Sequence, residues 1–238
     1  MDLRAQAGPP LGVPGENLDK ALVFDVFGTC VDWRSGVTRE VAAVAKRAGV
    51  AVDAAAFADA WRKLYQPSME RVRSGARPWT ILDVLHRESL DTLLPQYGLG
   101  GLSEAERADL NRAWHRLDPW PDTISGLTRL KGRYIVAPLS NGNVALLTNM
   151  AKRAGIPWDL VLSAETSRAY KPLPASYLNA VAMLGLEPGQ VMMTAAHNSD
   201  LEAARAQGLK TAFVARPTEH GPGQTSDMKP SRDWDVVA

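Results

Sequence analysis

The chain has 238 residues, of which 45% are hydrophobic and 22% are charged, and its formal net charge is +1. This length and composition are typical of a globular core domain with an insertion, large enough to fold without disulfides. The near-neutral charge argues against a nucleic-acid-binding protein that works through a broad basic face. Because Cys30 is the single cysteine, an internal disulfide and a four-cysteine zinc site are excluded.

The N-terminal stretch and the lack of long apolar segments bear on location. Residues 1–17 are rich in Gly and Pro without the apolar run of a signal peptide, and we expect a flexible tail there. No segment of the sequence approaches the roughly 18 apolar residues that a membrane span needs. Together with the lone cysteine, these features predict a cytoplasmic protein with no membrane partner.

The first predicted element is a buried strand at residues 21–24, an apolar run with Asp25 at its carboxyl end. Helical periodicity follows from about residue 37 to about residue 117, where apolar residues recur three or four positions apart. Within it, Ser103 and Glu106 have the spacing of a capping box at the start of a helix. We therefore predict that residues 36–118 form a helical cap domain inserted after the first strand.

Strands and helices alternate in the rest of the chain. The predicted strands are residues 134–139, 160–162, 191–194 and 211–214, and the predicted helices are residues 144–154, 176–184 and 201–207. Alternation of this kind predicts a doubly wound α/β fold, a parallel sheet with helices on both faces. We assign residues 18–35 and 119–238 to this core domain, in which residues 216–231 form a loop.

Polar side chains gather at the carboxyl ends of the predicted strands. In chain order they are Asp25, Thr29, Ser140, Asn141, Lys171, His197, Asn198 and Asp200. Parallel strands bring these ends to one edge of the sheet, so we expect the side chains to converge there. A carboxylate kept ionised by a neighbouring lysine is suited to covalent catalysis, in which it attacks an electrophilic carbon.

Four short motifs in this set resemble those of the haloacid dehalogenase superfamily. They are Asp25-Val26-Phe27-Gly28-Thr29, Ser140-Asn141-Gly142, Lys171-Pro172 and the stretch that closes at Asp200. Their order and spacing fit from about residue 20 to about residue 215, with the helical insertion between the first two motifs. The resemblance implies a Rossmann-like core with a helical cap.

The first motif separates the branches of that superfamily. Phosphatases in it usually carry Asp-x-Asp, in which the second Asp is the general acid, and Phe27 stands at that position here. The motif resembles instead the L-2-haloacid dehalogenase branch, also called haloacid dehalogenase type II. Arg62 and Tyr65 in the cap, and Tyr177 six residues after Lys171, are similar to residues of the same branch.

The resemblance implies a reaction and a set of partners. Short 2-haloacids would be hydrolysed to 2-hydroxy acids and halide, with inversion at C2 and without a metal or cofactor. Asp25 would displace the halide and form an ester, which water would then hydrolyse. Related enzymes are often homodimers, so a homodimer is expected.

The resemblance also implies roles for individual residues. The implied catalytic residues are Asp25, Thr29, Lys171, His197, Asn198 and Asp200. The implied substrate-binding residues are Val26, Phe27, Arg62, Ser140, Asn141 and Tyr177. Lys171 would keep Asp25 ionised. Ser140 and backbone N–H groups near Val26 and Phe27 would bind the substrate carboxylate. Arg62 and Asn141 would bind the departing halide.

The last motif departs from the usual form of the branch, Ser-x-Asn-x-x-Asp. Ala195 stands at the Ser position and His197 at the Asn position, with Asn198 beside it. His197 could replace the hydrogen bond of the Asn or serve as a base, and Asn198 could instead turn inward. The other histidines, His86, His115 and His220, lack metal-ligand spacing and are expected to be surface or core residues.

Two other functions are weighed against the dehalogenase. A phosphatase of the same superfamily would need Mg²⁺ and a general acid, but Phe27 replaces that acid and the last motif offers only Asp200 as a metal-binding carboxylate. A binding module could share the fold without catalysis. The presence of Asp25, Lys171 and Asp200 together argues against that second alternative.

Overall fold

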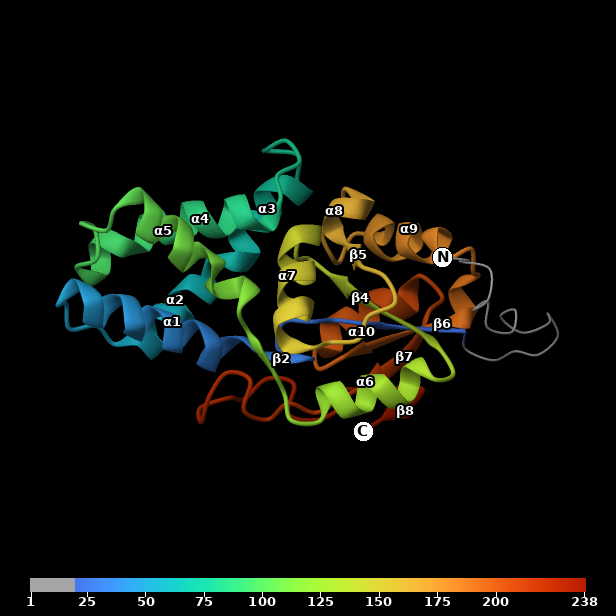
Figure 1. The fold of residues 1–238 in the computed structure, drawn as a ribbon. Helices are drawn as coiled ribbons and strands as arrows, with labels where there is room; N and C mark the ends of the chain where they lie inside the picture. Colours follow the sequence, from blue (N-terminus) through green and yellow to red (C-terminus); the bar gives the residue numbers. More distant parts are fainter. Residues whose placement is uncertain (1–19) are drawn as a thin grey trace, which may run out of the picture.

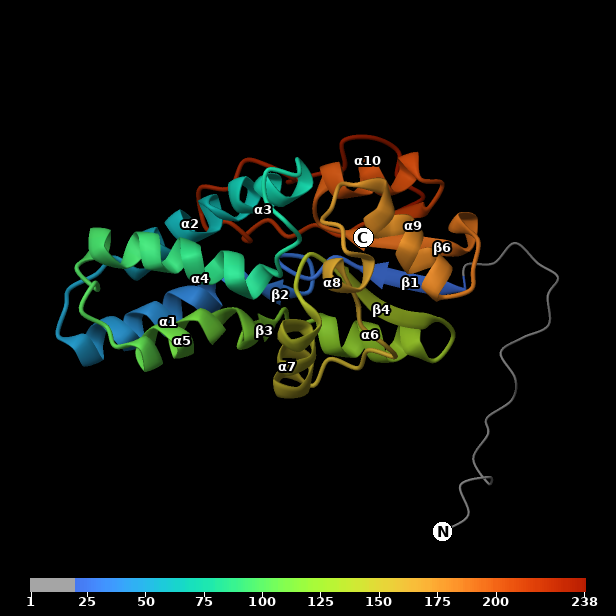
Figure 2. The same ribbon diagram turned by 90° about the horizontal axis from the view of Figure 1, so that it is seen from above.

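The computed structural model describes residues 20–238, so the predicted tail at residues 1–17 lies outside the described residues. It contains a sheet flanked by helices and, beside it, an elongated block of helices (Figures 1 and 2). None of the helices in the described part of the chain is long and apolar enough to cross a membrane.

The main sheet is parallel throughout and has the strand order β5-β4-β1-β6-β7-β8. Its strands are β1 (Ala21–Phe24), β4 (Ile135–Ser140), β5 (Leu162–Ser163), β6 (Val191–Ala195), β7 (Lys210–Phe213) and β8 (Val236–Val237). Because β1 lies between β4 and β6, the residue that follows it, Asp25, stands near the middle of the carboxyl edge. In sheets of this kind ligands bind at that edge, where the strand order reverses.

Side chains alternate between the two faces of the sheet, as the pleat requires. Leu22 and Phe24 pack in one cluster with α6 (Thr123–Lys131) and α7 (Val144–Ala154), whereas Val23 packs in a second cluster on the other side. The second cluster includes residues of α9 (Pro174–Met183) and α10 (Asn198–Ala206). Helices therefore cover both faces, which confirms the predicted doubly wound α/β fold.

The core also contains two short helices, and some of its elements begin or end at other residues than predicted. The short helices are α8 (Ala164–Ser167) and the 3₁₀ helix η3 (Pro188–Gln190). The predicted strands and helices have counterparts in the structure, but some boundaries move. β5 shares only Leu162 with the strand predicted at residues 160–162, and α10 begins at Asn198, three residues earlier than predicted, because His197 takes the N-cap position. As a result Asp200 lies in the first turn of that helix, close to the edge of the sheet.

The inserted block is connected to the core by a pair of short antiparallel strands, β2 (Val31–Asp32) and β3 (Asp118–Pro119). Its helices are α1 (Trp33–Ala48), α2 (Ala54–Lys63), α3 (Tyr65–Arg73), α4 (Leu82–Leu93), η1 (Leu94–Tyr97), α5 (Glu104–Asn111) and η2 (Arg112–His115). The Asp32 side chain accepts a hydrogen bond from the Ser35 backbone and caps α1, so the boundary expected at residue 36 falls inside this helix. The predicted capping box of Ser103 and Glu106 is present at the start of α5.

An aromatic cluster joins the cap to the core. The Phe27 ring, which follows β1, meets the Trp114 ring edge-on at 5.9 Å between centroids, and Trp114 in turn lies 5.5 Å from Trp61. Phe27, Trp61 and Trp114 are almost completely buried. Such contacts add to the hydrophobic free energy of burial and fix the cap over the carboxyl edge of the sheet.

Candidate active site

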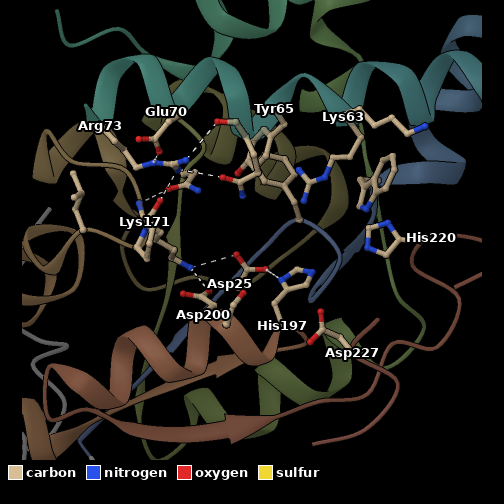
Figure 3. A pocket seen from close by; sticks show the side chains of 18 of the residues that line it. Asp25, Lys63, Tyr65, Glu70, Arg73, Lys171, His197, Asp200, His220 and Asp227 are labelled. Atoms are coloured by element: carbon tan, nitrogen blue, oxygen red, sulfur yellow. Dashed lines mark hydrogen bonds and ion pairs between the residues drawn. The ribbon is translucent and has the colours of Figure 1, made fainter. Parts of the chain in front are cut away.

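A cleft of about 1020 Å³ lies between the carboxyl edge of the sheet and the cap (Figure 3). The core contributes Asp25, Asn141, Lys171, Tyr177, His197 and Asp200 to its lining, and the cap contributes Trp33, Arg62, Tyr65 and Arg73. Eight of the twelve predicted site residues line this cleft. The exceptions are Val26, Thr29, Ser140 and Asn198.

Asp25 is the most heavily engaged carboxylate of the cleft. Lys171 Nζ lies 3.3 Å from its Oδ1, whereas Oδ2 accepts a hydrogen bond of 2.9 Å from Thr29 Oγ1 and lies 3.2 Å from His197 Nδ1. Burial alone would raise the pKa of Asp25, but the charges of Lys171 and His197 and the bond from Thr29 hold it far below its usual range. Asp25 is therefore ionised, as a nucleophilic carboxylate must be.

Lys171 joins Asp25 to a second carboxylate. Its Nζ lies 2.6 Å from Asp200 Oδ2, and the Tyr177 hydroxyl donates to Asp200 Oδ1 at 2.7 Å. Burial would lower the pKa of Lys171, but the charges of Asp200 and Asp25 raise it, so the side chain remains an ammonium. The Lys171 backbone donates to Asn141 Oδ1 at 2.9 Å, which connects the second and third motifs.

The cap also contacts Lys171 through an arginine that the sequence analysis did not identify. Arg73, at the end of α3, donates from Nη1 to the Lys171 carbonyl oxygen at 2.9 Å. The guanidinium also pairs with Glu70 one helical turn away. On sequence alone Arg73 is one more charge on an amphipathic helix, so no local pattern marks it.

His197 lies between two carboxylates. Its Nδ1 faces Asp25, and its Nε2 lies 2.9 Å from Oε2 of Glu219, a residue of the C-terminal segment. Burial would lower the pKa of His197, but the bonds and charges of Asp25 and Glu219 raise it to about 10. The ring is thus an imidazolium at neutral pH and donates to Asp25, which is the first of the two roles considered for it. A protonated ring has no free nitrogen to act as a base.

Glu219 contacts the site through His197, although the sequence analysis did not identify it. Its side chain is 1% exposed, although it belongs to a segment without regular helices or strands. Trp33 Nε1 donates to Glu219 Oε1 at 3.0 Å, and the carboxylate rests against Gly28, where an added Cβ would lie 2.1 Å from Oε1. Glycine is needed at position 28 for two reasons: a side chain would collide with Glu219, and the φ of +89° is one that other residues rarely adopt.

Asn198 does not turn inward, which corrects the expectation that it takes part in catalysis. Its Nδ2 donates to Asp227 Oδ1 at 2.8 Å, and its Oδ1 accepts from Trp234 Nε1 at 2.9 Å and from the Ser231 backbone at 2.8 Å. These bonds direct the side chain toward the C-terminal segment. The inward position belongs to its neighbour His197.

Three predicted residues are buried behind the lining of the cleft. Thr29 Oγ1 accepts from the Ala196 backbone at 2.9 Å while it donates to Asp25, so it connects the first motif to the last. Ser140 is 1% exposed and accepts from the Gly142 backbone at 3.2 Å. Val26 is fully buried.

Arg62, on α2, presents a cation to the cleft within an aromatic frame. Its guanidinium carbon lies 4.2 Å from the Tyr65 ring centroid, 5.2 Å from that of Trp33 and 5.9 Å from that of Phe27. Its Nη1 is buried and has no hydrogen-bond partner among the described residues. An unpaired N–H donor on a positive group inside apolar walls is suited to a small anion.

Among residues 20–238, one cluster of side chains has the residue types and spacing that could hold a metal ion. It consists of His197, Glu219 and His220, whose candidate ligand atoms lie within 4.8 Å of one another. The Glu219 carboxylate in this group already accepts hydrogen bonds from His197 and Trp33. His86 and His115 are buried in the cap outside the cleft.

Comparison with known proteins agrees with this arrangement. The model of the haloacid dehalogenase-like hydrolase family matches residues 20–208. An (S)-2-haloacid dehalogenase of Xanthobacter autotrophicus is 33% identical over 83% of this chain and 75% of its own.

Solved structures give the same result. A defluorinating L-2-haloacid dehalogenase is 54% identical, with a TM-score of 0.90 over 92% of this chain and 90% of its own. The X. autotrophicus L-2-haloacid dehalogenase with chloropropionic acid covalently bound is 26% identical, with a TM-score of 0.76 over 93% of this chain and 94% of its own. The chain therefore belongs to the haloacid dehalogenase-like hydrolase family.

Proposed function

We propose that the protein hydrolyses short 2-haloalkanoic acids to 2-hydroxy acids and halide through an ester of Asp25, with inversion at C2. The observation that carries the proposal is the position of an ionised Asp25 in the same cleft as Arg62, whose Nη1 has no hydrogen-bond partner among the described residues. The first is the nucleophile that the reaction needs, and the second is a site for the leaving anion.

The geometry assigns different tasks to the two oxygens of Asp25. Oδ2 receives both Thr29 and His197, whereas Oδ1 has the longer contact with Lys171. Oδ1 is therefore the freer nucleophile, and it bonds to C2 as the carbon–halogen bond breaks and its electron pair leaves with the halide. Lys171 and His197 keep the carboxylate ionised until then.

The remaining substrate contacts follow from the lining of the cleft. Arg62 and Asn141 bind the departing halide, and Phe27 supplies an apolar wall. Ser140 and the backbone N–H groups of residues 26 and 27, which lie directly behind the lining, bind the substrate carboxylate, as the resemblance implies. The cap excludes bulk water, which strengthens each of these charge interactions.

Hydrolysis of the ester completes the cycle. Water attacks Cγ of Asp25, and Asp200 takes the proton that the water loses. The bond between Cγ and Oδ1 then breaks, and the product leaves with Oδ1 and the proton held by Asp200. Asp25 keeps the oxygen of the water and its second proton, which it releases to the solvent because its pKa is held far below the usual range. The chloropropionic acid held covalently by the X. autotrophicus relative supports an ester of this kind.

The phosphatase alternative is weaker for a positional reason. Such an enzyme places a second carboxylate two residues after the nucleophile, and Phe27 is buried there among aromatic rings. The oxygens of Asp25 and Asp200 that would bind Mg²⁺ are already contacted by Lys171, Thr29, His197 and Tyr177. The cleft is thus arranged around an ammonium and an imidazolium.

Location and assembly complete the proposal. A cytoplasmic enzyme is favoured by the free thiol of Cys30, which is buried and unpaired as a reducing compartment allows. A homodimer rests on the resemblance to related enzymes alone. Light scattering of the purified protein tests it, and a monomer mass would contradict it.

Halide release is the decisive assay. With a chelator present, the purified protein would be given fluoroacetate, chloroacetate and each enantiomer of 2-chloropropionate. Fluoroacetate is included because a structural relative is described as defluorinating. We expect halide from the S enantiomer and none from the Asp25→Asn variant. Mg²⁺-dependent phosphate release from phosphomonoesters, without halide from any haloacid, would contradict the proposal.

A further inference from the structure

We propose that Thr29 and His197 together form the oxyanion-binding site for hydrolysis of the Asp25 ester, and that Glu219 is the positioning residue that holds the His197 ring as a donor. The inference rests on the proposed function. Two donors from different motifs converge on a single oxygen, Asp25 Oδ2, at 2.9 and 3.2 Å.

Asp25 Oδ2, the oxygen that both donors contact, is the one that carries the negative charge during ester hydrolysis. When Oδ1 forms the bond to C2, Oδ2 becomes the carbonyl oxygen of the ester. Attack of water on Cγ moves the carbonyl electron pair onto Oδ2, which then carries a negative charge until the bond between Cγ and Oδ1 breaks. Donors fixed on that atom before the reaction stabilise this charge most in the transition state.

Glu219 matters because ester formation removes a charge from the site. The resting ring has two anionic partners, Asp25 and Glu219, but Asp25 becomes neutral once it is esterified. Burial then opposes the charge on the ring, and Glu219 is the remaining carboxylate in contact with it. Without Glu219 the ring would lose its proton during the step in which the oxyanion forms.

The surroundings of Glu219 show that its position is built into the fold. Its carboxylate is held by Trp33 Nε1 from the cap and lies against Gly28 of the first motif. The ionisable groups around His197 come from every element packed there: Asp25 after β1, Lys171 before α9, Asp200 on α10, Arg62 on α2, and Glu219, His220 and Asp227 from the C-terminal segment (Figure 3). Arg62 and His197 both lower the pKa of Glu219, against the effect of burial, which keeps it ionised.

The test is the Glu219→Gln variant, whose amide has the same shape and can still accept from Trp33. In rapid-quench measurements with (S)-2-chloropropionate, we expect one equivalent of halide per active site in a fast first turnover and slow turnover afterwards. At pH 8 the steady rate should fall on the order of 10- to 100-fold. This is less than the roughly 10²- to 10³-fold effect of losing a whole oxyanion donor, because a neutral ring can still donate from Nδ1 without its charge. The loss should shrink only as the pH is lowered well below 6.5, the pKa of an ordinary histidine, because burial lowers the pKa of a ring that has lost its anionic partners.

A double-mutant cycle separates this role from a structural one. His197→Asn keeps an N–H donor without a charge, so Glu219→Gln should cost little further activity in that background. An equal cost in both backgrounds, or a first turnover slowed as much as the steady rate, would overturn the inference. If Glu219→Gln does not fold, His197→Asn against His197→Ala carries the test: the Asn variant should retain faster ester hydrolysis, and equal rates would overturn the inference. Absence of halide from the wild type would instead refute the proposed function itself.

Discussion

Two buried histidines, one at the edge of the core and one in the cap, have opposite acid–base properties. His197 lies between the carboxylates of Asp25 and Glu219, and its pKa is raised to about 10. His86 stacks on Trp114 at 4.4 Å, its two ring nitrogens have no hydrogen-bond partner among the described residues, and its pKa is lowered to about 3, chiefly by burial.

The difference shows that burial sets only the starting point for a titratable group. Burial lowers the pKa of both rings, and carboxylates within hydrogen-bond distance reverse the result for His197. The carboxyl edge of the sheet and the cap accordingly contribute different properties to the cleft. The core edge fixes charges against one another. The cap supplies aromatic walls around Arg62, whose Nη1 has no hydrogen-bond partner in the part of the chain that the structure describes.

The largest effect should come from removing Lys171, the cation that Asp25 and Asp200 share. Lys171→Met leaves Asp25 and Asp200 buried without their shared ammonium. We expect halide release to fall by at least about 10²-fold and the free energy of unfolding to fall by about 3–5 kcal/mol. Chemical denaturation and halide assays measure both. Lys131→Met, which breaks a half-exposed pair with Asp159, is the control and should cost under about 1 kcal/mol.

A glycine substitution tests how closely the core edge is packed around Glu219. Gly28→Ala adds a methyl group 2.1 Å from Glu219 Oε1 at a φ of +89°, so we expect a loss of about 2–4 kcal/mol from strain and displacement together. Gly75→Ala is the control, because its φ is +76° and its added Cβ meets open space. Equal losses in the two variants, measured by thermal unfolding, would show that the contact with Glu219 carries no cost.

The sequence predicted most of the fold because strands and helices here have clear periodicity. The buried run at residues 21–24, the cap helices and the alternating core follow from apolar spacing, and Asp25 and Lys171 follow from their places at strand ends and in motifs. Glu219 gave no such signal, since it lies in a segment of turns and its role depends on a contact with Gly28 far away in the chain. The local sequence likewise does not decide whether His197 or Asn198 faces the cleft. The choice is set by the start of α10 and by Trp234, Asp227 and the C-terminal backbone.

The raised pKa of His197 predicts how the free energy of unfolding depends on pH. In the folded protein His197 binds its proton up to about pH 10, against 6.5 for the ordinary side chain, so the folded state holds more protons in that interval. The stability that His197 contributes is fully present below pH 6.5 and is lost as the pH rises through about 10. Thermal unfolding between pH 6 and pH 10 should show this decline, and it should be shallower in His197→Asn. An identical slope in the variant would assign the decline to other groups.

The smallest effect should come from the histidine of the cap. His86→Phe replaces a neutral ring whose nitrogens have no partners with an apolar ring of similar size among Trp61, Tyr65 and Trp114. Two opposing effects are involved: the variant no longer buries two polar atoms, but it must fit a six-membered ring into a packed cluster. We therefore expect a change in unfolding free energy within about 1 kcal/mol and unchanged halide release.

The matched control for that variant is another buried histidine of the cap, His115. Its ring bonds to Asp83 at 3.0 Å and to Asn149 at 3.0 Å, so His115→Phe removes two hydrogen bonds. We expect a loss of about 1–3 kcal/mol. If His86→Phe cost as much as His115→Phe in chemical denaturation, His86 would have a polar partner in solution. The different pKa values of His86 and His197 would then come from different kinds of hydrogen-bond partner, and not from the lack of a partner at His86.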